Sequence, residues 1–292
     1  MTAFDPRHPR RVLVTGGAGL LGQALIDSAP PGIELHATQR HTPVSRAEST
    51  PLDLADDSAV HELWRALRPD LVIHTAYGTA RPERDLWQAT RNVVAATQRV
   101  GAQLIHLSTD ALFDGHASPY DESAPPTPIF EYGRWKARLE QHLHTEMPGA
   151  AIIRTSLLTR AAPLDERSAW VANALRRGEP LTLFVDELRM PITPGDLARQ
   201  LWEIAALPPA QQGGVWHLVG PELLSRYALG LLIAAHQRLD PAGITPTLAR
   251  DHPSPRPRVL HLLTARADRM LHHRPRTISA EFAPSPEATV PG

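Results

Sequence analysis

A cluster of glycines that directly follows a short apolar run constrains the fold more than any other feature of this sequence. The run at residues 11–15 predicts a strand, and residues 20–28 predict a helix. Between them lies Thr15-Gly16-Gly17-Ala18-Gly19-Leu20-Leu21-Gly22, in which Gly17, Gly19 and Gly22 satisfy the spacing G-x-G-x-x-G. Glycines at these places let the chain turn sharply and leave the first N–H groups of the helix open to an anion.

This loop has two interpretations: a plain turn between strand and helix, or the pyrophosphate-binding loop of a dinucleotide site. Its position after the first strand of a β-α-β unit favours the second interpretation. We therefore predict cofactor contacts from Gly16, Gly19, Leu20, Leu21 and Gly22.

Strands and helices alternate regularly over the first half of the chain. Apolar runs predict strands at 33–38, 70–74, 103–107 and 150–154, and amphipathic stretches predict helices at 57–67, 83–100 and 130–146. This order specifies a doubly wound parallel sheet with helices on both faces, a Rossmann-type α/β fold. Beyond residue 155 the pattern loosens, and we expect strands at 181–185 and 215–218 and helices at 166–177, 195–206, 223–238 and 260–271. The expected organisation is a dinucleotide-binding domain at 1–155, a smaller C-terminal substrate-binding lobe at 156–283, and a disordered tail at 284–292.

Composition excludes several classes of function. The 292 residues include no cysteine, which removes disulfide scaffolds, thiolate metal sites and cysteine nucleophiles. A formal net charge of −1 and a pI near 7.0 create no field that would attract nucleic acid or an anionic membrane. The histidines lack the spacing of a zinc site, and no apolar run approaches the length of a membrane span. We expect a cytoplasmic protein without a metal.

The residues after the second strand bear on the choice of dinucleotide. NAD-preferring sites usually place an acidic residue here to hold the ribose 2′-hydroxyl, but this strand ends in Gln39-Arg40-His41. A guanidinium suits a 2′-phosphate, so Arg40 favours NADPH, with NADH as the alternative and a solvated surface arginine as the plain interpretation. Asp53 and Leu54 are placed to meet the adenine, although an aspartate there is also an ordinary signal for a helix start. Further cofactor contacts are expected after the third and fourth strands, at Thr75, Ala76, Tyr77 and Ser108.

Tyr132 and Lys136 are four residues apart at the start of a predicted helix, so they share one face and reach one ligand. Lys136 is the only lysine in the chain. A nearby cation, with the positive charge of an oxidised nicotinamide, favours the phenolate of a tyrosine, which then exchanges a proton with a carbonyl or alcohol. Both residues are therefore candidates for catalysis and for cofactor binding.

Hydroxyl side chains lie where the fourth strand ends, in Ser108-Thr109-Asp110. Doubly wound sheets bind ligands at this edge. Thr109 can hydrogen-bond the carbonyl oxygen that Tyr132 protonates, with Ser108 as the near alternative. The plain interpretation is a hydroxyl that satisfies the backbone at the strand end.

With these motifs the chain resembles the extended short-chain dehydrogenase/reductase superfamily over about residues 11–280, and within it the dTDP-4-dehydrorhamnose reductase family. The residues 108–115, Ser-Thr-Asp-Ala-Leu-Phe-Asp-Gly, are similar to that family's S-T-D-x-V-F-x-G, and Arg154-Thr155-Ser156 matches its R-T-S. The segments 186–191, 196–198 and 214–218 resemble its substrate-side segment and the strand that follows. The resemblance implies Thr109, Tyr132 and Lys136 as the catalytic trio. It also implies substrate contacts from Thr109, Asp110, Tyr132, Ser156 and Arg189.

Some positions depart from the family's pattern. Leu157 stands where the family usually has a tryptophan, and residues 74–79 and 80–83 differ from its N-A-A-x-T and V-D-x-A-E. These positions line the sugar pocket in the family, so the ring that is recognised can differ. Ala111 replaces the glutamate of related sugar-nucleotide dehydratases, which argues against dehydration.

The sequence thus predicts an NADPH-dependent reductase that acts on a 4-keto nucleotide sugar. Two alternatives stay open: a nucleotide-sugar epimerase with bound NAD, and a non-catalytic NADP-binding regulatory subunit. A homodimer is an expectation at the level of the family.

Overall fold

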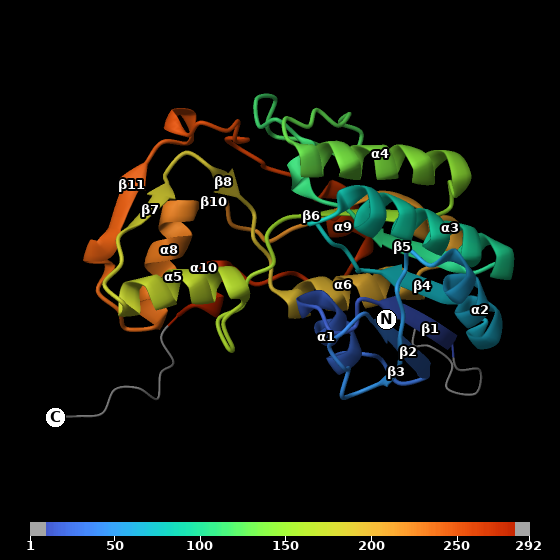
Figure 1. The fold of residues 1–292 in the computed structure, drawn as a ribbon. Coiled ribbons are helices and arrows are strands. Elements are labelled where there is room, and N and C mark those ends of the chain that lie inside the picture. The colour runs from blue at the N-terminus through green and yellow to red at the C-terminus, as the bar shows by residue number, and fades with distance from the viewer. Residues whose placement is uncertain (1–9, 284–292) are drawn as a thin grey trace.

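A parallel sheet of seven strands forms the centre of the larger lobe in the computed structural model, which describes residues 10–283 (Figure 1). Its spatial order is β3-β2-β1-β4-β5-β6-β9, and all neighbours run parallel. The strands are β1 (Arg10–Thr15), β2 (Ile33–Gln39), β3 (Glu48–Pro51), β4 (Leu71–His74), β5 (Gln103–Leu107), β6 (Ala151–Thr155) and β9 (Gly214–Leu218). The order of the strands reverses at β1, and ligands bind at such switch points. The predicted Rossmann-type fold is confirmed.

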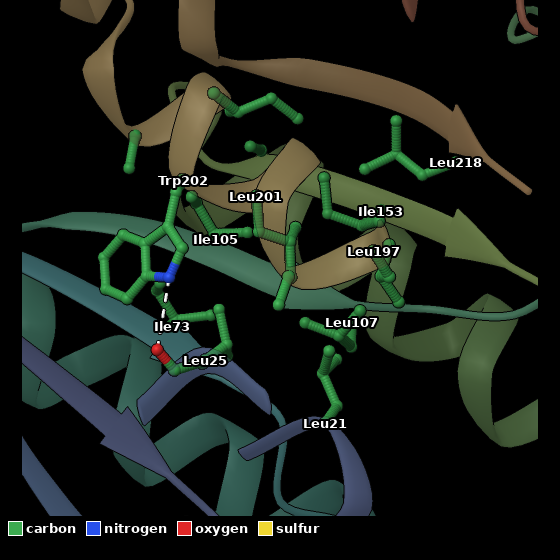
Figure 2. Close-up of a cluster of buried hydrophobic side chains, with 14 of the residues drawn as sticks. Leu21, Leu25, Ile73, Ile105, Leu107, Ile153, Leu197, Leu201, Trp202 and Leu218 are labelled. Carbon is green, nitrogen blue, oxygen red and sulfur yellow. Dashed lines mark hydrogen bonds between the residues drawn. The ribbon is translucent and has the colours of Figure 1, made fainter. Parts of the chain in front are cut away.

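Helices cover both faces of this sheet. On one face lie α1 (Leu20–Asp27) and α6 (Pro194–Ala206), and on the other lie α2 (Asp57–Leu67), α3 (Ala89–Val100) and α4 (Glu131–Glu146) (Figure 1). Alternation along β1 explains the layers, because Val12 and Val14 enter the first core cluster and Leu13 the second. Figure 2 shows the first cluster, where Trp202 of α6 donates from Nε1 to the Leu25 carbonyl oxygen at 3.2 Å. Apolar burial on both faces therefore holds the strand ends in place.

The smaller lobe has a hydrophobic core of its own, which includes Val171, Leu181, Ile233 and Phe282. Its elements are α5 (Glu166–Arg176), β7 (Leu181–Phe184), β8 (Leu188–Arg189), β10 (Leu224–Ser225), α8 (Arg226–His236), β11 (Ile244–Thr247) and α10 (Ile278–Glu281). Short helices fill the connections: the π-helix η1 (Glu83–Gln88), η2 (Asp110–Leu112), α7 (Pro209–Gln212), η3 (Pro241–Gly243), η4 (Ala249–Asp251) and α9 (Ala265–Met270). None of the helices among residues 10–283 is long and apolar enough to cross a membrane.

Several elements differ from the predicted ones. The strand β3 escaped prediction because Glu48-Ser49-Thr50-Pro51 shows no apolar alternation, as befits an edge strand. The helix expected at 223–238 starts at 226, since Leu224 and Ser225 pair with β8 and Ser225 caps the helix. The helix expected at 260–271 is confined to α9.

The predicted smaller lobe at 156–283 is not continuous in space. The strand β9 pairs with β6 in the central sheet, and α6 packs on α1 in the first core cluster. The reason is that the apolar strand Gly214–Leu218 satisfies the open edge of β6, a long-range pairing that sequence patterns do not reveal. The division at residue 155 stays a prediction, and the tail predicted at 284–292 lies outside the described residues.

Candidate cofactor and catalytic site

The glycine loop has the geometry that an anion-binding turn requires. Gly16 has a φ of +74°, which favours glycine, and a Cβ on Gly22 would lie 2.2 Å from the Gly16 carbonyl oxygen. Gly19 is the N-cap of α1, where no side chain caps the helix and the first turn holds no acidic residue. The first N–H groups of α1 are therefore available to a phosphate, and the loop fits the pyrophosphate of a dinucleotide.

The segment after β4 lies against this loop. The Thr75 hydroxyl donates to the Thr15 carbonyl oxygen at 2.7 Å, and a Cβ on Gly16 would come within 2.9 Å of the Ala76 backbone. Tyr77, the next residue, is 66% exposed. The structure thus brings Thr75, Ala76 and Tyr77 to the glycine loop, as a shared cofactor site requires. Leu54, by contrast, is buried in the second core cluster.

Arg40 lies at the end of β2 as expected, but its guanidinium is already paired. Its Nη2 is 2.7 Å from Asp85 Oδ1 and 3.4 Å from Asp53 Oδ1. Burial acts to raise the pKa of Asp85, yet hydrogen bonds from Arg40 and Arg84 outweigh it and keep that pKa below its ordinary value. Arg40 is thus an exposed arginine that belongs to an ion network, and its contact with a 2′-phosphate stays a prediction.

Tyr132 and Lys136 lie on α4 beside the end of β5. Lys136 is buried and donates from Nζ to the Leu107 carbonyl oxygen at 2.8 Å, and this ammonium lies 6.0 Å from the centre of the Tyr132 ring. Thr109 lies next to the Tyr132 phenol and acts to lower its pKa. The hydroxyl of Thr109 also accepts from the Ala111 N–H at 3.1 Å, so it caps η2 as well. The structure therefore brings the predicted trio together.

The pKa of Tyr132 differs from the expectation. Burial, with the neighbouring Tyr77 and Asp110, raises this pKa above its ordinary value, although Thr109 acts in the opposite direction. In the protein without a cofactor, burial of the phenol decides the direction of this shift, and the expected lowering by an oxidised nicotinamide stays a prediction. Burial also lowers the pKa of Lys136 to about 8, against the opposing charge of Glu140. The site holds a neutral phenol beside a buried ammonium.

Ser108 is hydrogen-bonded within the protein, and its predicted contact with the cofactor stays a prediction. Its hydroxyl donates to Glu140 Oε1 at 2.5 Å, and Arg154 Nη2 lies 2.8 Å from Glu140 Oε2. All three residues are buried. Glu140 was not among the predicted site residues, although it lies one turn after Lys136 on α4 and its spacing from Lys136 could have indicated it. This network fixes α4, which carries the pair, to the ends of β5 and β6.

Replacement of Glu140 by glutamine (Glu140→Gln) is expected to lower the free energy of unfolding by about 3–5 kcal/mol, because it leaves the buried Arg154 without a carboxylate. Urea-induced unfolding measures this change. The control is Glu179→Gln, since Glu179 pairs with Arg177 on the surface and such a pair contributes about 0–1 kcal/mol. Equal losses for the two variants would show that the buried network does not stabilise the fold.

Three predicted substrate-binding residues also lie together: Asp110, Ser156 and Arg189. In this structure their polar atoms contact one another. The Ser156 hydroxyl donates to Asp110 Oδ2 at 2.6 Å, and Arg189 Nε lies 3.8 Å from the same oxygen. Arg189 belongs to β8 of the smaller lobe, whereas Asp110 and Ser156 follow strands of the central sheet. These three residues therefore link the two lobes, and their predicted contact with substrate stays a prediction. Among residues 10–283, no group of three or more potential metal ligands is found.

Together, the switch-point loop, the Tyr132 and Lys136 pair and the two-lobed architecture define a protein of the extended short-chain dehydrogenase/reductase type. A family model described as the RmlD substrate binding domain matches residues 10–283, and the chain belongs to this family. The resemblance predicted from the motifs is confirmed.

Individual relatives carry two kinds of name. The chain is 30% identical over 250 residues to methionine adenosyltransferase 2 subunit beta of Danio rerio, covering 81% of this chain and 77% of that protein. It is 27% identical over 260 residues to dTDP-4-dehydrorhamnose reductase of Mycolicibacterium smegmatis, covering 85% and 76%. The crystal structure of dTDP-4-dehydrorhamnose reductase from Bacillus anthracis in complex with NADP has a TM-score of 0.80 at 21% identity, covering 94% of this chain and 97% of that chain, and shares the fold.

Proposed function

We propose that this protein is an NADPH-dependent reductase of a 4-keto nucleotide sugar. The observation that carries the proposal is the half-buried Tyr132 phenol, which lies beside Thr109 and the Lys136 ammonium at the sheet edge that carries the glycine loop. The reductase relative from Mycolicibacterium smegmatis and the NADP in the Bacillus anthracis structure support the reaction class and the cofactor. NADH remains the alternative cofactor.

The residues act on the carbonyl oxygen of the substrate. When bound, a reduced nicotinamide would supply hydride to the carbonyl carbon. Tyr132 donates its phenolic proton to the oxygen, and its raised pKa keeps that proton in place until the oxygen gains charge. Thr109 orients the oxygen through its hydroxyl. The ammonium of Lys136 stabilises the phenolate that is left, and solvent then returns a proton to Tyr132.

The substrate lies between the two lobes in this proposal. Leu157, where the family usually has a tryptophan, offers no aromatic face to a sugar ring. Asp110 and Arg189 already bind each other, so a sugar gains their contact only at the cost of that ion pair. A different 4-keto sugar from that of the reductase relatives therefore fits this site as well.

A regulatory subunit is the second candidate. It is favoured by the relatives named methionine adenosyltransferase 2 subunit beta, which match at up to 30% identity. The retained trio weighs against it, because binding alone does not need a buried lysine next to a tyrosine. An epimerase with bound NAD is the nearest enzymatic alternative, and it differs in consuming no NADPH.

Addition of dTDP-4-dehydro-L-rhamnose to the purified protein and NADPH is expected to oxidise the cofactor in a one-to-one ratio with product, followed by absorbance and by chromatography of the sugar. Product without NADPH consumption would indicate an epimerase. Binding of NADPH with no turnover of this sugar or of other 4-keto sugars would contradict the reductase proposal and favour the regulatory subunit.

A further inference from the structure

An ion network of three arginines and two aspartates lies at the end of β2, and sequence analysis identified only part of it. Arg84 Nη1 is 2.9 Å from Asp85 Oδ1, the same oxygen that Arg40 contacts at 2.7 Å. Arg84 also pairs with Asp53 through Nη2, and Arg81 Nε lies 3.5 Å from Asp85 Oδ2. The guanidinium groups of Arg40 and Arg84 therefore share both of their carboxylate partners.

The two aspartates have different surroundings. The side chain of Asp85 is only 5% exposed, and a Cβ on Gly78 would lie 2.9 Å from the Asp85 Cβ, so a glycine at 78 makes room for this carboxylate. The buried carboxylate of Asp85 thus contacts the guanidinium groups of both Arg40 and Arg84 and orients them. The side chain of Asp53 is 36% exposed and contacts the same two arginines from the solvent side.

The exposed side of this network suits an anion. Arg40 and Arg84 are 35% and 38% exposed, which leaves part of each guanidinium open to solvent. Three arginines against two aspartates leave a positive excess. A hollow of about 700 Å³ adjoins Arg84 and is lined in part by Arg81 and Ala55. A phosphate that takes the place of the exposed Asp53 carboxylate would meet two guanidinium groups already oriented by Asp85.

We propose that Arg84 binds the 2′-phosphate of NADPH together with Arg40, and that Arg84 is thereby a residue that determines the preference for NADPH over NADH. The proposal rests on the proposed function only in that the glycine loop binds a dinucleotide. Asp53 is the carboxylate that the phosphate displaces from the two arginines. Arg84 contacts no reacting atom, so its effect lies in cofactor affinity rather than in the chemical step.

The test is the affinity of the full-length protein for NADP⁺ and NAD⁺, measured by calorimetry without any sugar. Arg84→Gln is expected to weaken NADP⁺ binding about 10- to 100-fold, as loss of a charge-assisted hydrogen bond to phosphate implies, while NAD⁺ binding changes by less than about twofold. Removal of both arginines in Arg40→Gln/Arg84→Gln should abolish the preference for NADP⁺. Circular dichroism of each variant verifies the fold.

The control is Arg46→Gln, which removes an arginine that also pairs with an aspartate, Asp27, but lies outside the network. It should leave both affinities unchanged. Equal affinities of wild type and Arg84→Gln for NADP⁺, or an equal loss for the two dinucleotides, would overturn the role of Arg84. A wild-type protein that binds neither dinucleotide would instead refute the proposed function itself, and Arg84 with it.

Discussion

Replacement of Tyr132 by phenylalanine is expected to lower the turnover number about 10²- to 10⁴-fold, which is the usual contribution of a general acid. The variant loses the only atom that the proposed mechanism uses to protonate the substrate oxygen. It keeps the aromatic ring beside Lys136, so the packing of α4 is retained. The affinity for NADPH, measured by fluorescence titration, should therefore change little.

The control for this prediction is Tyr227→Phe. Tyr227 packs against the core cluster of the smaller lobe. Its replacement by phenylalanine removes the same hydroxyl group at a place far from the proposed chemistry. Its turnover number should stay close to that of the wild type. A Tyr132→Phe variant with the wild-type rate would refute the role of Tyr132 as proton donor, even if the protein binds NADPH.

The value of kcat/KM is expected to fall as the pH rises through about 8, because Lys136 loses its proton there. Burial lowers the pKa of Lys136 to about 8, from an ordinary value of 10.5. Above this pH the neutral amine no longer stabilises the phenolate of Tyr132. Replacement by methionine (Lys136→Met), which fills the same buried space without the charge, should lower the rate by about 10²-fold or more and remove this pH dependence.

Loss of the Lys136 proton is expected to lower kcat/KM but to raise the free energy of unfolding. Between pH 8 and 10.5 the unfolded chain keeps the Lys136 proton that the folded protein has lost, so the contribution of this group to the free energy of unfolding rises with pH. Urea-induced unfolding of wild type and Lys136→Met at several pH values isolates this contribution. A wild-type rate that stays constant up to pH 10 would contradict the proposed role of the ammonium.

Local sequence determined the glycine loop and the start of α4. The glycine spacing after residues 11–15 implied a strand, a tight turn and a helix, because only glycine permits the φ of +74° at Gly16 and the close approach at Gly22. A spacing of four residues on one helix similarly implied that Tyr132 and Lys136 meet. These features depend on residues that are neighbours in the chain, and sequence patterns report such neighbours directly.

Contacts between distant residues were decided by the tertiary structure alone. The pairing of β9 with β6, the network of Ser108 with Glu140 and Arg154, and the contact of Arg40 with Asp85 join residues that are 14 to 63 positions apart. The burial that raises the pKa of Tyr132 arises in the same way. The physical reason is that these partners are selected by the packing of whole layers, which depends on the apolar burial of many residues at once and leaves no periodic signal in the chain.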